Sequence, residues 1–115
     1  MSDRIYKIVS KSAWAEAEKA GVFKGAEIDL ADGYIHFSSA DQVVETASKH
    51  FAGRENLVLV AVISEHLGEQ LKWEKSRNDE LFPHLYGELE MSAIDSVNTL
   101  PLKPDGTHEF SGLLT

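Results

Sequence analysis

The stretch LVLVAVI, Leu57–Ile63, is the longest strongly apolar run in the sequence and the best guide to its fold. Seven consecutive apolar residues have the length of one strand and lack the polar alternation of a strand with a solvated face. We therefore predict a strand that is covered on both faces. The run is too short to cross a membrane as a helix, which needs about 20 apolar residues.

A first helix is predicted to follow an N-terminal strand over Ile5–Val9, where apolar and polar-capable residues alternate. Ser12 is a suitable N-cap for a helix that runs from Ala13 to about Ala20, and a glycine then stops it. The residues that share its inner face at helical spacing are Trp14, Ala17 and Gly21.

A second helix is predicted from Ala40 to about Ala52, with Gly53 as its end. Ser39 and Gln42 form the Ser-x-x-Gln pattern of a capping box, in which each side chain binds a backbone N–H of the first turn. The residues expected to face inward are Val43, Val44, Ala47 and Phe51. The segment Val22–Leu30, upstream, is predicted to be a connector with one short extended piece.

Further extended segments complete the predicted fold. They are Tyr34–Ser38, Leu71–Trp73, His84–Tyr86 and an edge strand over Val97–Leu102, where Pro101 has no N–H to donate. Helices and strands do not alternate regularly along the chain, which favours an α+β fold over a doubly wound parallel sheet. We expect one compact domain over residues 1–115, with about two main helices and a core from about residue 4 to 110.

Composition excludes several classes of function. The net charge is −8, from 19 acidic and 11 basic residues, which argues against general nucleic-acid binding and against docking on anionic membranes. The chain has no cysteine, so disulfides, thiolate catalysis and cysteine-based zinc sites are excluded. No signal-peptide pattern opens the sequence, and we expect a cytoplasmic protein.

The first candidate for chemistry is the predicted strand Tyr34–Ser38. Alternation places Tyr34, His36 and Ser38 on one face, where an imidazole and a hydroxyl can reach one ligand. The other face carries Ile35 and Phe37, which we expect to be buried. The structural alternative is a half-buried strand whose polar face meets solvent or a helix, with Ser38 serving only the helix-capping turn.

The second candidate is the segment Leu81–Gly87, in which His84 and Tyr86 share one face. Pro83 and Gly87 make its backbone path specific. The alternative is a packed strand with a hydrogen-bonded structural histidine.

A third candidate precedes it, where Glu74, Ser76 and Arg77 lie close together in sequence. Arginine can bind a phosphate or a carboxylate through two parallel hydrogen bonds. The alternative is an exposed polar loop with a surface ion pair. A metal site formed by His36, His84 and Glu74 is conceivable, but no local ligand spacing supports it, and we expect no metal. The remaining histidines are weaker candidates, and His50 is expected to face outward from its helix.

Four segments, taken together, resemble a bacterial family. They are Ile5–Val9, Asp32–Ser38, Trp73–Arg77 and Leu81–Gly87, and the family is the domain-of-unknown-function family 952. The likeness runs from Arg4 to about Phe110. It implies a fold similar to that of ADP-ribosyltransferases, in which a split, mixed sheet surrounds a cleft that takes NAD.

The resemblance also implies roles for individual residues. His36 and Ser38 would hold a ribose, Arg77 a phosphate, and His84 with Tyr86 the far wall of the cleft. Glu74 would stabilise a positive ribosyl centre, so the catalytic candidates are Glu74, His36 and His84. The ligand-binding candidates are Ser38, Arg77, Tyr86 and Tyr34. The first strand carries Tyr6 and Lys7 where transferases carry histidine or arginine.

Two functions follow from this sequence. One is a domain that binds NAD or a related ribonucleotide, with ADP-ribosyltransferase-like chemistry as a possible activity. The other is a non-catalytic module that binds a small ligand or a protein partner, since no glutamate aligns with the transferase motif. For the first function, we predict that five side chains far apart in sequence meet at one site; if they do not, the binding-module alternative takes its place. They are His36, Glu74, Arg77, His84 and Tyr86.

Overall fold

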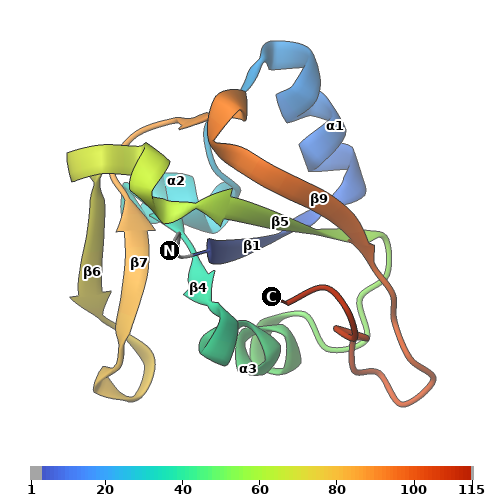
Figure 1. The fold of residues 1–115 in the computed structure, drawn as a ribbon. Helices are drawn as coiled ribbons and strands as arrows, with labels where there is room; N and C mark the ends of the chain where they lie inside the picture. Colours follow the sequence, from blue (N-terminus) through green and yellow to red (C-terminus); the bar gives the residue numbers. More distant parts are fainter. Residues whose placement is uncertain (1–3, 115) are drawn as a thin grey trace.

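The structure is a computed structural model that describes residues 4–114 (Figure 1). Its strands are β1 (Arg4–Ser10), β2 (Val22–Phe23), β3 (Ile35–His36), β4 (Ser38–Ser39), β5 (Leu57–Ile63), β6 (Leu71–Lys75), β7 (Leu81–Leu85), β8 (Leu89–Glu90) and β9 (Ile94–Leu100). Its α-helices are α1 (Lys11–Ala20), α2 (Glu27–Asp32) and α3 (Ala40–His50). Short 3-10 segments are η1 (Ser64–Gln70), η2 (Arg77–Asp79) and η3 (Met91–Ala93).

The described strands form three separate sheets, in the orders β4-β1-β5-β9, β3-β7-β6 and β2-β8. Every strand pairing between described residues is antiparallel. The α+β class is therefore confirmed and the sheet is split, but the mixed sheet implied by the resemblance is wrong. Antiparallel neighbours need no crossover helix, which agrees with the small helical content.

Strand β5 lies inside the largest sheet, between β1 and β9, and both of its faces are covered. Val58, Val60 and Val62 pack in one apolar cluster with Trp14 and Ala17 of α1. The alternate residues Leu57, Leu59 and Ala61 pack in a second cluster with Val43 and Ala47 of α3. The prediction from the apolar run is confirmed, because the period of two places each set on its own side.

The segment predicted as one strand over Tyr34–Ser38 is divided between two sheets. Strand β3 pairs with β7, whereas β4 pairs with β1. Phe37 lies between them, and its backbone N–H donates to the carbonyl of Pro83 at 3.0 Å. Ile35 and Phe37 are buried as predicted, at 1% and 3% exposure. The single strand is wrong because each dipeptide finds its backbone partner in a different sheet.

Helix α1 begins earlier than the sequence pattern predicts. Its N-cap is Ser10, whose Oγ accepts a hydrogen bond from the backbone N–H of Ala13 at 3.2 Å, so Ser12 is not the cap. Gly21 ends the helix with a φ of 81°, as predicted. Only a residue that tolerates left-handed backbone fits this position without strain.

Helix α2 lies in the segment predicted to be a connector. Its N-terminal turn is stabilised by Asp29, whose Oδ2 accepts from the backbone N–H of Ala26 at 2.7 Å. Helix α3 has the predicted cap, since the N–H of Ser39 donates to Oε1 of Gln42 at 3.0 Å. Val44, expected to face inward, is 49% exposed.

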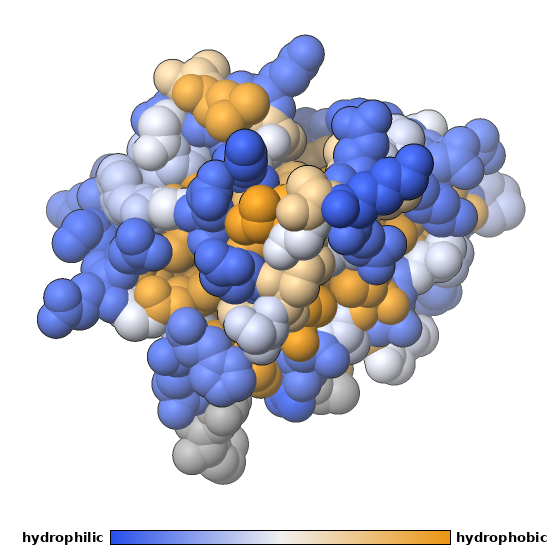
Figure 2. All heavy atoms as spheres, turned by 90° about the horizontal axis from the view of Figure 1, so that it is seen from above, coloured by the Kyte–Doolittle hydropathy of each residue, from blue (hydrophilic) through white to orange (hydrophobic). Residues whose placement is uncertain are grey.

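The central strand of the three-stranded sheet, β7, contains Pro83. A proline normally occupies an edge strand because it has no N–H for the ladder. Here the β3 ladder covers only His84 and Leu85, so Pro83 lies beyond its end. On the face of the molecule shown in Figure 2, apolar side chains form several areas separated by polar and charged ones.

Candidate functional site

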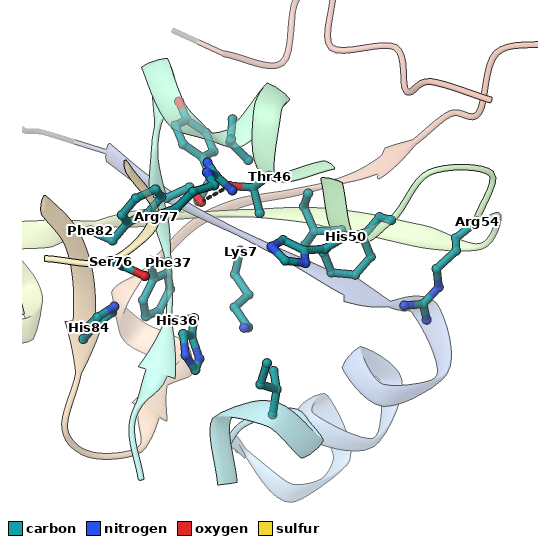
Figure 3. Close-up of a pocket in the computed structure, with 16 residues that line it drawn as sticks. Lys7, His36, Phe37, Thr46, His50, Arg54, Ser76, Arg77, Phe82 and His84 are labelled. Carbon is teal, nitrogen blue, oxygen red and sulfur yellow. Dashed lines mark hydrogen bonds between the residues drawn. The ribbon is translucent and has the colours of Figure 1, made fainter. Parts of the chain in front are cut away.

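A pocket of about 360 Å³ opens where α3, strand β1 and the three-stranded sheet approach one another (Figure 3). Its lining includes five of the candidate residues from the sequence, namely His36, Ser38, Ser76, Arg77 and His84. Glu74, Tyr34 and Tyr86, also predicted, do not line it. The volume lies near the lower end of the roughly 300–1,000 Å³ typical of small-molecule sites.

The lining is rich in groups that carry or can carry positive charge. These residues are Lys7, His36, His50, Arg54, Arg77 and His84. None of the described residues that line the pocket is an aspartate or a glutamate, although the chain has 19 of them. The pocket therefore presents donors and cations in a protein whose overall charge is −8.

A buried carboxylate, Asp29, organises one side of this pocket from behind. Its side chain is 2% exposed, and both of its oxygens lie 3.0 Å from Nζ of Lys7. Oδ1 also lies 2.7 Å from Nδ1 of His36 and accepts the backbone N–H of His36 at 3.1 Å. With the Ala26 N–H on Oδ2, this carboxylate has a complete set of donors.

The pKa values of both Asp29 and Lys7 are shifted in this cluster. Burial alone would raise the pKa of Asp29, but the His36 hydrogen bond, the charge of Lys7 and two backbone N–H groups outweigh it and lower the pKa to about 2. Burial lowers the pKa of Lys7, and the neighbouring Asp29 opposes that change. Since the carboxylate stays ionised, it favours the ammonium form of Lys7 at the floor of the pocket.

Both ring nitrogens of His36 face carboxylates. Nδ1 contacts Asp29, as described, and Nε2 lies 3.0 Å from Oδ2 of Asp32 at the end of α2. The ring borders the pocket, as the strand pattern predicts, but its own protein occupies both of its polar atoms. A ligand can reach the edge of this ring without finding a free nitrogen.

A second carboxylate, Glu74, lies on β6, the strand that pairs with β7 and therefore with the segment that carries His84. Its Oε1 lies 2.8 Å from Nδ1 of His84 and 2.7 Å from the hydroxyl of Tyr86. Hydrogen bonds from Tyr86 and then His84 lower the pKa of Glu74. The same carboxylate raises the pKa of Tyr86 to about 12, chiefly because ionisation of the phenol would break its hydrogen bond to Glu74; burial and the repulsion between two negative charges add to the shift.

Four rings connect the two carboxylate clusters. Tyr34 stacks on His84 with 4.2 Å between centroids and an interplanar angle of 27°. Its ring is also 4.7 Å from that of His36 and 5.2 Å from that of Tyr86. The imidazoles of His36 and His84 are 5.5 Å apart, so the two histidine motifs meet although 48 positions separate them.

Arg77 reaches the opposite side of the pocket and is held there by α3 and β7. Its Nε lies 2.9 Å from Oε1 of Glu45, and Nη2 donates to Oγ1 of Thr46 at 3.2 Å. The guanidinium also lies over the ring of Phe82, 4.9 Å from its centroid. Figure 3 shows Arg77 beside Thr46, with Lys7 extending toward His36. The hydroxyl of Ser38 lies 2.9 Å from that of Thr46.

The turn that follows Arg77 has an unusual backbone. Asn78 and Asp79 have φ values of 58° and 60°, in the left-handed region. Such residues cost on the order of 1 kcal/mol each and are enriched at functional sites. Both residues directly follow Arg77 in η2.

Sequence reasoning missed several residues of the site. Lys7 had a usable signal, because it is the one charged residue between apolar neighbours in β1. Asp29 had none, since α2 was not predicted. Arg54 follows α3 without any motif. His50 is exposed, as predicted, but it lines the pocket.

Two searches of the described structure bear on cofactors and membranes. Over residues 4–114, no group of three or more His, Cys, Asp or Glu side chains is arranged to hold a metal ion. Within the same range, no helix is both long and apolar enough to span a membrane.

Comparisons with known proteins place this geometry in a wider group. Residues 8–97 match the model of a family described as protein of unknown function (DUF952). The chain is similar to protein CC0527 from Caulobacter crescentus, whose crystal structure is 48% identical, covers 94% of this chain and 95% of that chain, and has a TM-score of 0.91. The solution NMR structure of CC0527 is 47% identical over 97% of each chain, with a TM-score of 0.87. No curated protein matches the chain.

Proposed function

The chain belongs to this DUF952 family, and on that premise we propose that its pocket binds an anionic ribonucleotide, either NAD or a smaller relative such as a mononucleotide. The observation that carries the proposal is the composition of the lining. Cations, imidazoles and hydroxyls converge there without an acidic residue among the described lining positions. Such a lining attracts phosphate and rejects like-charged cations.

Individual lining residues suit the parts of such a ligand. Arg77 offers a planar guanidinium next to the Thr46 and Ser38 hydroxyls, a combination that binds phosphate oxygens well. Lys7 supplies a second positive charge from β1. Phe37, Phe51 and Phe82 add apolar surface against which a base or a pyridine ring can pack.

The size of the pocket favours one nucleotide unit inside it. A volume of about 360 Å³ suits a ligand at the small end of the range for drug-sized molecules. A dinucleotide such as NAD would place one half within the pocket and the other half along its rim.

The geometry supports binding more directly than ADP-ribosyl transfer. Transfer needs a carboxylate beside the ribose, and Glu74 does not line the pocket. Its Oε1 already accepts hydrogen bonds from His84 and Tyr86. We therefore assign Glu74 to the support of His84 and limit the proposed function to binding.

Isothermal titration calorimetry tests this proposal with NAD, ADP-ribose, AMP, adenosine and inorganic phosphate. We expect at least one phosphorylated nucleoside to bind, and adenosine to bind about tenfold or more weakly, because charge-assisted hydrogen bonds contribute about 1.5–3 kcal/mol. Arg77→Gln should weaken binding of the phosphorylated ligand by a similar factor.

Arg4→Gln is the matched control. Arg4 also forms an ion pair with one carboxylate, Asp95, at 2.6 Å, but it does not line the pocket. This variant should bind like the original chain. If no member of the panel binds, the proposal is wrong and the alternative of a protein-binding module takes its place.

A further inference from the structure

We infer that His84 is the residue of the pocket that recognises a ligand hydroxyl group, and that Glu74 holds the His84 ring in the tautomer which this recognition needs. The inference rests on the proposed function, because it assigns a specific contact within the same pocket. It changes the assignment implied by the family resemblance, in which His36 holds the ribose.

The two histidines of the pocket differ in what remains free on each ring. His36 uses both nitrogens, toward Asp29 and Asp32. His84 uses only Nδ1, and within the described part of the chain its Nε2 has no hydrogen-bond partner. His84 is therefore the imidazole with a nitrogen available to a ligand.

The contact with Glu74 decides which nitrogen of His84 carries the proton. A carboxylate oxygen can only accept, so the Nδ1 that faces Oε1 at 2.8 Å must be the N–H. The neutral ring then presents Nε2 as a lone pair. An acceptor at this place requires a donor on the ligand, and a hydroxyl group is the donor that a ribose supplies.

The ring is also fixed in orientation. Tyr34 stacks on one face of His84, and the Tyr86 hydroxyl holds the same oxygen of Glu74 from another direction. His84 as a residue is 2% exposed, so packing limits the movement of its ring. A ligand that donates to Nε2 therefore meets an acceptor that is already oriented, which reduces the entropy cost of binding.

Other lining residues add to the selectivity of the pocket for particular ligand groups. Lys7 and Arg77 can only donate hydrogen bonds, which suits an anionic group. The free nitrogen of His84 accepts. The pocket therefore selects a ligand with an anionic group at one place and a hydroxyl at another, which is the chemistry of a sugar phosphate or ribonucleotide.

The test compares AMP with 2′-deoxy-AMP and 3′-deoxy-AMP by calorimetry. We expect one of the two deoxy ligands to bind about tenfold more weakly than AMP to the original chain. Glu74→Ala should reduce this discrimination to about threefold or less, since the ring loses its fixed proton and orientation. Glu74→Gln should retain most of it, because the amide oxygen still accepts from Nδ1.

Lys72→Ala is the matched control for these variants. Lys72 is exposed, lies two residues before Glu74 on β6 and pairs with His84 in the strand register. The discrimination of this variant should equal that of the original chain. An equal loss of discrimination in Lys72→Ala and Glu74→Ala would overturn the role of Glu74.

Ring nitrogen chemical shifts, measured by NMR on the protein labelled with ¹⁵N-histidine, give a second readout that needs no ligand. We expect the neutral ring of His84 to carry its proton on Nδ1, and Glu74→Ala to show a mixture of the two tautomers. A proton on Nε2 in the original chain would overturn the inference. So would AMP binding with both deoxy ligands equally tight, which leaves the proposed function intact. If no nucleotide binds, the proposed function and this inference fall together.

Discussion

Two carboxylates, Asp29 and Glu74, each bind a histidine of the same pocket, but their surroundings differ. Asp29 is 2% exposed and receives donors on both oxygens, including the ammonium of Lys7. The Glu74 side chain is 39% exposed, and both of its described hydrogen bonds fall on one oxygen. The first carboxylate holds the fold together at the pocket floor, whereas the second adjusts one side chain.

The comparison teaches how to separate structural from functional histidines. At His36 two carboxylates, Asp29 on Nδ1 and Asp32 on Nε2, occupy both ring nitrogens and leave nothing for a ligand. A carboxylate that takes one nitrogen fixes the tautomer and leaves the other free, as at His84. Stability and titration measurements on single variants test this distinction.

Replacing Asp29 with alanine should destabilise the protein by about 3–5 kcal/mol, because it leaves Lys7 buried without its counter-charge. Urea denaturation measures the change in the free energy of unfolding. Asp95→Ala is the control, since it breaks the exposed ion pair with Arg4 and should cost under about 1 kcal/mol. Equal losses in both variants would contradict the structural role of Asp29.

Replacing His36 with alanine should cost about 1–3 kcal/mol, because Asp29 loses a charge-assisted hydrogen bond. His50→Ala removes an exposed imidazole from the rim of the same pocket and should change stability by under about 0.5 kcal/mol. Thermal unfolding of both variants checks the order. A larger effect at His50 would show that the two ring nitrogens of His36 contribute little.

Acid should weaken the Asp29 cluster. Its folded-state pKa is about 2, below the ordinary value of 3.8, so its contribution is present above about pH 4 and is lost as the pH falls through about 2. The unfolding midpoint, measured from about pH 5 to pH 2, should decline over this range. The unfolding midpoint of Asp29→Ala should fall less over this pH range, because the variant has no Asp29 carboxyl to protonate.

High pH should break the hydrogen bond from the Tyr86 hydroxyl to Glu74. The pKa of Tyr86 is about 12, above the ordinary value of 10, so its contribution is present below about pH 10 and is lost as the pH rises through about 12. Ultraviolet titration of tyrosinate should show one phenol ionising late, and Tyr86→Phe should remove that step. Glu74→Ala should move it back toward pH 10, and an unchanged step would refute the contact.

Glu74→Ala should destabilise the protein far less than Asp29→Ala, because the Glu74 side chain is well exposed to solvent. Chemical denaturation of this variant, beside Asp29→Ala, compares the two carboxylates directly. A loss as large as that of Asp29→Ala would mean that Glu74 is a structural residue and that the distinction drawn here fails.

The sequence predicted the parts of the fold that follow from periodicity. The strand Leu57–Ile63, the burial of Ile35 and Phe37, and the capping box at Ser39 depend on local patterns, and the structure has them. The division of the Tyr34–Ser38 strand was not predictable, because it depends on which distant strands supply backbone partners. Helix α2 was missed because Ile28 and Leu30 point outward, at 61% and 66% exposure.

The candidate site shows the same limit. Alternation along two short motifs was enough to select His36 and His84, whose rings come within 5.5 Å. Their different roles were not readable from sequence, because they depend on contacts across the fold: Asp29 and Asp32 occupy both nitrogens of His36, whereas Glu74 occupies one nitrogen of His84. Arg77 was selected for its chemistry, and contacts with Glu45 and Thr46 of α3 hold it in the pocket.

The single residue between β3 and β4 also limits how such a chain can vary. Phe37 alone connects β3 to β4, which lie in two different sheets that are each held by backbone hydrogen bonds. One added or deleted residue there would turn the following side chains to the opposite face. Homologues can therefore exchange side chains in this segment, but its length should be as invariant as a catalytic motif, while loops elsewhere grow and shrink.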